Sequence, residues 1–224
     1  MESHQIRLML VEDHAMVREG MKAVLSEYEG ISVIGEAADG LRAIQLVKQL
    51  KPDIVLVELL LSGMDGIETI QRMIAIRPEQ RAIVLTAYDK GDKVDQAARA
   101  GAMGYLVKNI EPEELVQSIR KVYSGIPAFS SRVLWRLLTK DEVKPFERRK
   151  ALTAREVDVL RLLARGYTDQ EIADELWLSG VTVRTHVNRV IIKLGLKNRV
   201  QAALYAIRSG LVTLEEARHP GESG

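Results

Sequence analysis

The first half of the chain alternates short apolar runs with longer amphipathic stretches. The apolar runs are nearly continuous and rich in β-branched residues and leucine, as expected of parallel strands that are buried on both faces. They lie at Ile6–Val11, Ile31–Gly35, Ile54–Val57, Ala82–Thr86 and Gly104–Val107. Helical periodicity follows each run, at residues 14–28, 40–50, 66–77, 91–101 and 111–124. Five strand–helix repeats predict an α/β fold, a doubly wound five-stranded parallel sheet with helices on both faces.

The alternation stops near Gly125, and every later periodic segment is helical. Residues 125–150 have the composition of a linker, within which residues 131–139 have the pattern of a short helix. Further helices are expected at 153–165, 169–177, 180–194 and 198–208, and Thr153 with Glu156 fits a capping box at the first of them. We therefore expect one domain at residues 1–124, an all-α domain at residues 151–214 and a flexible tail at residues 215–224.

Composition excludes several classes of protein. The chain has 224 residues and no cysteine, which excludes disulfides, thiolate metal sites and cysteine nucleophiles. No apolar run approaches the roughly 18–20 residues of a membrane span, and residues 1–7 are too polar to begin a signal peptide. We expect a cytoplasmic protein without a membrane segment.

The net charge of +1 conceals an uneven distribution. Residues 1–146 carry 19 basic and 21 acidic residues, whereas residues 147–224 carry 13 basic and 10 acidic residues. The segment Leu176–Leu214 holds six basic residues and no acidic one. A basic, acid-free segment in a balanced chain indicates a surface for a polyanion, although an ordinary solvated helix face would give the same count.

Polar residues follow four of the expected strands. Glu12 and Asp13 follow the first, Glu58 ends the third, Thr86 ends the fourth and Lys108 ends the fifth. In a doubly wound sheet these strand ends meet on one side, where functional crevices lie. Three carboxylates in one small site repel one another unless a cation neutralises them, so Mg²⁺ held by Glu12, Asp13 and Glu58 is expected. Thr86 could hydrogen-bond an anion there, and Lys108 could pair with it.

These residues resemble the receiver domain of two-component response regulators, a flavodoxin-like fold, over about residues 5–124. The matching motifs are LVEDH, PDIVLVELLLSGMDG, VLTAY and GYLVK. The resemblance implies that Glu12 and Asp13 hold Mg²⁺ and that residue 58 occupies the position of the aspartate that accepts a phosphoryl group. It further implies that Thr86, Tyr105 and Lys108 relay the presence of that group.

Residue 58 departs from this family pattern, because it is glutamate rather than aspartate. The extra methylene moves the carboxylate on the order of an ångström, and misplacement on that scale can slow phosphoryl transfer by ~10²-fold. Leu61 and Ser62 also stand where the family has Met-Pro. Three interpretations remain open: a natural pseudo-receiver, an engineered phosphomimetic substitution, and a working glutamyl acceptor.

Two helices joined by a tight turn form the centre of the second domain. Residues 168–178 and 181–194 flank the turn at Ser179-Gly180, an arrangement typical of a helix-turn-helix. The inward positions of the second helix are apolar, which leaves outward a set of donors suited to base edges and phosphates: Arg184, Thr185, Asn188 and Arg189. An ordinary helical hairpin with a basic surface is the alternative.

The stretch from LTARE to the following Ala-rich helix, about residues 150–212, resembles the LuxR-type helix-turn-helix of the NarL/FixJ regulators. The resemblance implies that Arg184, Thr185 and Asn188 face bases, that Lys193 and Arg199 lie near phosphates, and that Thr182 and Arg189 belong to the same DNA-binding set. It identifies a sequence-specific transcriptional regulator that binds double-stranded DNA, rather than an enzyme, with a sensor histidine kinase as a further partner. Because one helix-turn-helix reads only a few base pairs, we expect a homodimer on DNA. Two alternatives remain: a flavodoxin-like protein that binds a phosphorylated cofactor, and a protein-interaction module that does not bind DNA.

Overall fold

The computed structural model describes residues 5–87, 91–129, 151–213 and 216. These residues fall into two compact units, the first of which ends at Tyr123 but also includes Pro127–Phe129. The short helix expected at 131–139 and most of the expected linker and tail lie outside the described residues. Among the helices that the structure describes, none is long and apolar enough to cross a membrane.

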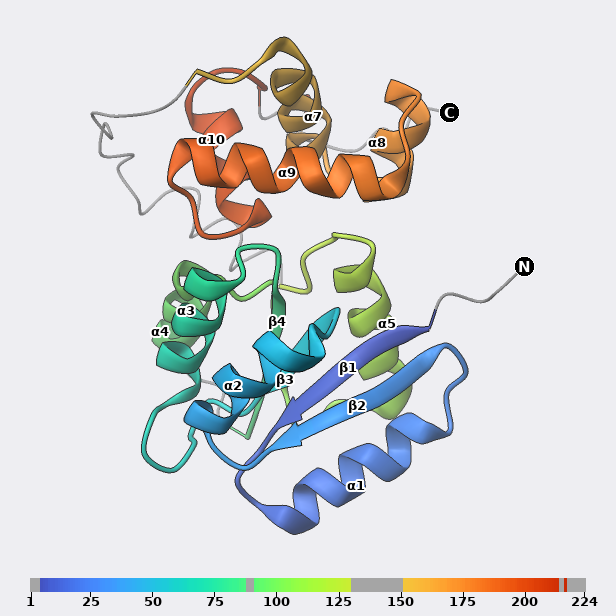
Figure 1. Ribbon diagram of the computed structural model, residues 1–224, viewed down its shortest axis with the longest axis vertical. Helices are drawn as coiled ribbons and strands as arrows, with labels where there is room; N and C mark the ends of the chain where they lie inside the picture. The colour runs from blue at the N-terminus through green and yellow to red at the C-terminus, as the bar shows by residue number, and fades with distance from the viewer. Residues whose placement is uncertain (1–4, 88–90, 130–150, 214–215, 217–224) are drawn as a thin grey trace. The chain divides into compact units, whose positions relative to one another are not determined.

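The first unit is the expected five-stranded parallel sheet. Its strands run in the order β2-β1-β3-β4-β5 (Figure 1). They span Ile6–Val11 (β1), Ile31–Ala37 (β2), Ile54–Val57 (β3), Arg81–Thr86 (β4) and Gly104–Val107 (β5). This is a doubly wound order whose direction reverses between β1 and β3, so the loops after these two strands open a crevice at their carboxyl ends.

Five helices cover the two faces of this sheet. They span Ala15–Ser26 (α1), Gly40–Leu50 (α2), Gly66–Ile76 (α3), Gly91–Ala100 (α4) and Pro112–Tyr123 (α5). Proline begins α5 because the first helical position needs no backbone N–H donor. Asp65 caps α3 by accepting a hydrogen bond from the Glu68 N–H, which is the role that its spacing from Glu68 predicts.

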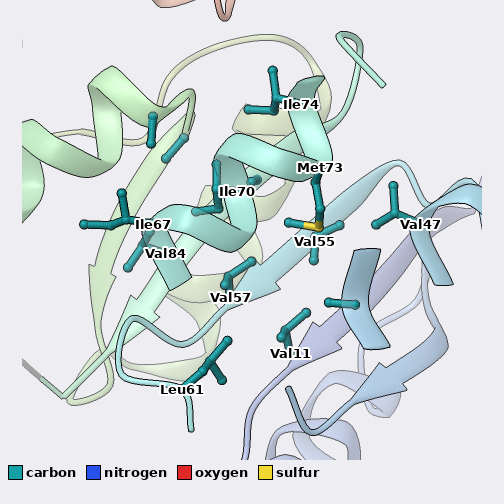
Figure 2. Packing of buried hydrophobic residues seen from close by; sticks show 14 of the residues in the cluster. Val11, Val47, Val55, Val57, Leu61, Ile67, Ile70, Met73, Ile74 and Val84 are labelled. Carbon is teal, nitrogen blue, oxygen red and sulfur yellow. The ribbon is translucent and has the colours of Figure 1, made fainter. Parts of the chain in front are cut away.

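Alternate strand residues enter two separate hydrophobic cores, which confirms that the strands are buried on both faces. Met9, Val55 and Val84 point to the face covered by α2, α3 and α4. Figure 2 shows this packing, with strand valines lying against Ile70 and Met73 of α3. Leu8, Leu56 and Ile83, among others, point to the opposite face, which α1 and α5 cover.

The second unit is built from helices alone. They span Ala154–Ala164 (α7), Asp169–Leu176 (α8), Gly180–Leu194 (α9) and Arg199–Arg208 (α10) and share one hydrophobic core. Thr153 and Glu156 form the expected capping box on α7, and Thr168 with Glu171 forms a second one on α8.

The connection between α8 and α9 is short, as a helix-turn-helix requires. Trp177 adopts a left-handed backbone conformation, with φ 56°, and ends α8. Ser179 then caps α9 by accepting a hydrogen bond from the Thr182 N–H. Gly195, at φ 67°, ends α9 in the left-handed conformation that glycine adopts at little cost.

Candidate functional site

The structure brings the strand-end residues of the first unit together. Residue pairing between β1 and β3 sets Val11 beside Val57, so the next residues, Glu12 and Glu58, emerge next to each other. The Glu58 N–H donates to the Val11 carbonyl at 2.9 Å, which extends the sheet by one residue. Glu12 and Thr86 are fully buried and Glu58 is 6% exposed, so their charges and hydroxyl lie out of bulk water.

Lys108 joins the two buried carboxylates. Its Nζ lies 2.6 Å from Glu12 Oε2 and 2.6 Å from Glu58 Oε2. The other oxygen of Glu58, Oε1, accepts hydrogen bonds from Thr86 Oγ1 at 2.6 Å and from the Leu60 N–H at 2.9 Å. Both oxygens of Glu58 are therefore engaged, and Lys108 supplies the positive charge that lets two carboxylates lie side by side.

These contacts shift the pKa values of the site. Burial alone would raise the pKa of Glu58, but the hydrogen bonds from Lys108, Thr86 and the Leu60 N–H outweigh it, and the pKa is lowered. Burial likewise opposes the charge of Lys108, yet its hydrogen bonds to Glu12 and Glu58 raise the pKa of the ammonium group. The site therefore holds an ionised carboxylate and an ionised lysine at neutral pH.

Asp13 lies at the rim of this site and differs from the buried pair. Its Oδ2 accepts hydrogen bonds from Ser62 Oγ at 2.8 Å and from the Ser62 N–H at 3.2 Å. Burial raises the pKa of Asp13, but the hydrogen bonds from Ser62 and the nearby His14 outweigh this effect, and the pKa is lowered. The other oxygen, Oδ1, is buried and accepts no hydrogen bond from any described residue, although His14 Nδ1 lies 3.0 Å away.

The three expected metal ligands are divided. Ligand atoms of Glu12, Asp13 and His14 lie within 4.8 Å of one another, whereas Glu58 is not part of this group. The free Asp13 Oδ1 and the Glu12 carboxylate are oxygen donors of the kind that Mg²⁺ prefers, so these two residues fit the ion. Glu58 instead directs its oxygens to Lys108, Thr86 and Leu60.

Tyr105, the third expected switch residue, lies one strand beyond Thr86. It is half-buried, and its side chain packs against the core under α2, α3 and α4. The pairing of β4 with β5 sets Thr86 beside Val107, so Lys108, the next residue, lies at the same strand end as Thr86. Tyr105 instead pairs with Val84, two residues before Thr86 in β4. Thr86 and Lys108 therefore contact Glu58, whereas Tyr105 lies two residues before the end of β4 and packs into the core.

In the second unit, the apolar positions of α9 point inward and leave one face to solvent. Val183, Val187 and Val190 are buried, whereas Thr185 and Arg189 are exposed. Thr182 Oγ1 lies 2.8 Å from the Ser179 hydroxyl, and Asn188 is half-buried. Thr185 and Arg189 therefore point outward, as the apolar pattern predicts, whereas Arg184 and Asn188 are half-buried.

Buried acidic residues engage three of the basic residues expected at DNA. Arg184 Nε lies 3.4 Å from Asp169 Oδ2, and Lys193 Nζ lies 2.6 Å from Glu156 Oε2. Glu156 is 2% exposed; burial would raise its pKa, but Lys193 and the backbone and side chain of Thr153 lower it. Sequence reasoning identified Glu156 only as a helix cap and missed that it also fixes Lys193.

Arg199 departs from the expectation that it lies near phosphates. It is 6% exposed, and its guanidinium donates to Asp169 Oδ1 at 2.5 Å and to the Tyr167 carbonyl at 3.2 Å. A side chain held in this way stabilises the interior of the domain and offers little surface to a duplex. Asp169, 30 positions earlier, is the acidic residue that could have indicated this ion pair. Spacing along the chain, however, does not show which charged residues meet in the fold.

Two family models cover most of the chain. That of the response regulator receiver domain matches residues 8–120, and that of bacterial regulatory proteins of the luxR family matches residues 150–206. The chain is 39% identical over 212 residues to the transcriptional regulatory protein LiaR of Bacillus subtilis (strain 168), covering 92% of this chain and 99% of the relative. The chain belongs to the NarL/FixJ family of response regulators. It is a DNA-binding transcriptional regulator of the two-component type with a LuxR-type helix-turn-helix.

Two solved structures of response regulators are similar to part or most of the chain. A LuxR-family response regulator from Aurantimonas sp. SI85-9A1 is similar at a TM-score of 0.56 and 34% identity, over 59% of this chain and 95% of that one. A structure of two RcsB dimers bound to two parallel DNAs is similar at a TM-score of 0.54 and 25% identity, over 92% of this chain and 98% of that one. Membership of this family of regulators overturns the alternatives of a cofactor-binding flavodoxin-like enzyme and of an interaction module without DNA binding.

The lowered pKa of Glu58 predicts an acid-sensitive contribution to stability. Ionised Glu58 stabilises the fold fully above its ordinary pKa of 4.5, and this contribution is lost as the pH falls through the lowered pKa of the folded protein. Glu58→Gln should lower the free energy of unfolding by about 1–3 kcal/mol at pH 7. The difference between the two proteins should shrink below pH 4.5 in urea unfolding followed by circular dichroism. A difference that stays constant down to pH 3.5 would contradict this, and Glu19→Gln, on the exposed side of α1, is the matched control.

The burial of Arg199 predicts a role in stability that needs no DNA. Arg199→Ala leaves Asp169 buried without its closest partner, which should lower the free energy of unfolding by about 2–3 kcal/mol. Lys197→Ala, which removes a nearby exposed charge, should change it by less than about 0.5 kcal/mol. Chemical denaturation of both variants without DNA tests this. Equal stability of the two variants would return Arg199 to the DNA-contacting set.

Proposed function

We propose that this regulator works without a phosphoryl group on residue 58. The observation that carries the proposal is the engagement of Glu58, whose two oxygens contact Lys108 Nζ and Thr86 Oγ1, each at 2.6 Å. By resemblance, these are the residues that relay the presence of a phosphoryl group. The Glu58 carboxylate occupies them permanently, so the balance between inactive and active states is set by the sequence or by a partner rather than by phosphorylation.

The same contacts argue against the glutamyl-acceptor interpretation. Attack on a phosphoryl donor requires a carboxylate oxygen aligned with the phosphorus. One oxygen of Glu58 is tied to Lys108 and the other to Thr86 and the Leu60 N–H, so neither is free to align without breaking charge-assisted hydrogen bonds. A natural pseudo-receiver and a phosphomimetic substitution both fit this geometry.

The carboxylate should mimic a phosphoryl group only in part. It carries one negative charge and two oxygens, whereas a phosphoryl group carries nearly two charges and three oxygens. Lys108 also contacts Glu12 at 2.6 Å, so its ammonium is shared rather than drawn wholly to residue 58. We infer a receiver of intermediate activity whose output changes when a partner protein, such as a sensor histidine kinase, binds it.

Mg²⁺ has a reduced role in this proposal. Asp13 and Glu12 would hold the ion, and it would supply positive charge beside the buried carboxylates. Lys108 already provides such charge, so we expect weak binding that stabilises the receiver only slightly. A large rise in melting temperature on adding Mg²⁺ would contradict this.

For the output domain, we propose that α9 enters the major groove of the duplex. Thr182, Arg184, Thr185, Asn188 and Arg189 would face the DNA, and Lys193 would lie near phosphates from its place beside Glu156. Arg199 is left out of this set because it is buried. The regulator would act in the cytoplasm, where the chromosome lies.

We further propose that the regulator binds DNA as a homodimer. One helix-turn-helix reads only a few base pairs, and two copies on a pseudo-palindrome multiply the specificity. The similar RcsB chains are dimers on DNA. Light scattering of the complex with a two-half-site duplex should give two chains per duplex, and one chain per duplex would exclude the dimer.

Phosphorylation is tested directly with acetyl phosphate and Mg²⁺. The unaltered protein should gain no stable phosphoryl group at residue 58 by intact mass, whereas Glu58→Asp should be labelled, with rates differing by about 10²-fold or more. Glu58→Gln, which keeps the length of the side chain without its charge, is the matched control and should stay unlabelled. Comparable labelling of the unaltered protein and the aspartate variant would refute the proposal.

The placement of α9 is tested by two arginines with different expected roles. Arg184→Ala should weaken binding about tenfold and change the preferred sequence, whereas Arg189→Ala should weaken binding to all duplexes and lower the salt slope by about 1. Lys193→Ala is a poor test because it removes the cation that pairs with the buried Glu156, which would change stability as well as DNA binding. Lys48→Ala, an exposed charge lost from the receiver, is the control and should change neither quantity. Unchanged affinity and slope in both arginine variants would exclude α9 from the interface.

A further inference from the structure

One line of residues on the outer side of α9 is not basic. Val181, Thr185, Asn188 and Ile192 recur at intervals of four, three and four residues, which places them on one stripe of an α-helix. We call these four residues the outer stripe. Val181 is 75% exposed and Ile192 is 62% exposed, and the opposite side of the helix lies in the domain core. The helix therefore presents two aliphatic side chains where the surface points farthest from the core.

Basic residues flank the outer stripe rather than lie on it. Arg184 and Arg189 fall to either side, at angles that follow from their positions in a 3.6-residue turn. Arg184 is further turned toward Asp169, with Nε 3.4 Å from Oδ2. Arg189 on one side suits a phosphate backbone that borders the groove, whereas Arg184 on the other side stays within reach of the base edges beside the stripe.

The groups at the middle of α9 are chemically selective. Thr185 donates its hydroxyl proton to the Val181 carbonyl at 3.0 Å, so this side chain offers a methyl group and lone pairs but no free donor. Val181, one turn earlier, offers two methyl groups. Asn188 offers the paired donor and acceptor that match adenine N7 and N6. In the major groove, only thymine presents a methyl group for aliphatic side chains to contact.

We propose that Val181, together with the Thr185 methyl group, recognises the C5 methyl group of thymine in each operator half-site, in which Asn188 reads an adenine. This rests on the proposed placement of α9 in the major groove. Ile192 lies roughly 16 Å further along the helix axis, so it does not share these bases. Val181 thereby determines specificity through an apolar contact. The base pairs that α9 contacts in each half-site then include A·T pairs.

The experiment replaces thymine by deoxyuridine, which removes the methyl group and changes nothing else in the groove. Duplexes selected from a random pool by the full-length protein supply the operator. Each thymine of a half-site is then replaced in turn, and affinity is measured at fixed salt. The unaltered protein should lose roughly threefold to tenfold at one or two thymines, the effect of one or two buried methyl groups.

Val181→Ala supplies the second arm. Its exposed position and the higher helix propensity of alanine keep the domain folded, which circular dichroism checks. This variant should bind the thymine duplex more weakly and lose most of its sensitivity to deoxyuridine at the same position. Ile192→Ala removes an equally exposed aliphatic side chain from the same stripe and is the matched control, which should keep the full sensitivity.

Two results would overturn this inference and leave the proposed placement of α9 intact. One is equal affinity of the unaltered protein for thymine and deoxyuridine at every position, and the other is full methyl sensitivity in Val181→Ala. In both cases Arg184→Ala would still change the preferred sequence, so the proposed placement of α9 would stand. If no sequence is selected and Arg184→Ala has no effect, the placement of α9 fails and the inference fails with it.

Discussion

The ammonium group of Lys108 makes it possible for two carboxylates to lie buried at the ends of β1 and β3. Glu12 is fully buried and Glu58 nearly so, and each has an oxygen 2.6 Å from Lys108 Nζ. Without this cation, two negative charges in a poorly solvated crevice would repel each other. The two carboxylates come together because β1 and β3 are neighbours in the sheet and the loops that follow them open at the same point. The ion-pair network is therefore a condition of the fold as well as a feature of the site.

The fold of the receiver follows closely from the sequence. Three of the five expected strands have the bounds of the structure, and the strands around Ile31 and Ala82 differ by one or two residues at an end. This accuracy has a physical cause, since buried parallel strands give continuous apolar runs and amphipathic helices interrupt them with a different period. The parallel direction of these strands also made the convergence of four side chains predictable, those of Glu12, Glu58, Thr86 and Lys108. Parallel strands bring their carboxyl ends to one edge of the sheet.

The partners of each charge could not be predicted in the same way. The contact of Leu60 N–H with Glu58 depends on the path of a loop, and the contact of Ser62 with Asp13 depends on the same loop. The resemblance to the LuxR-type domain implies that Arg199 lies near phosphates, yet Asp169 holds it inside. Sequence spacing reports the face of a helix, whereas the pairing of charges on different helices depends on tertiary distances.

Two acidic residues near the starts of helices, Glu156 on α7 and Asp169 on α8, also limit how the output domain responds to salt. A basic side chain that already lies beside a carboxylate has part of its charge neutralised before it meets a phosphate, so it contributes less to the electrostatic attraction of DNA. Lys193, Arg184 and Arg199 are held in this way, so the six basic residues of the segment 176–214 overstate its affinity for polyanions. We therefore expect the electrostatic attraction of such a domain to random duplexes to be modest. Discrimination between sites then depends more on the base edges than on the total charge.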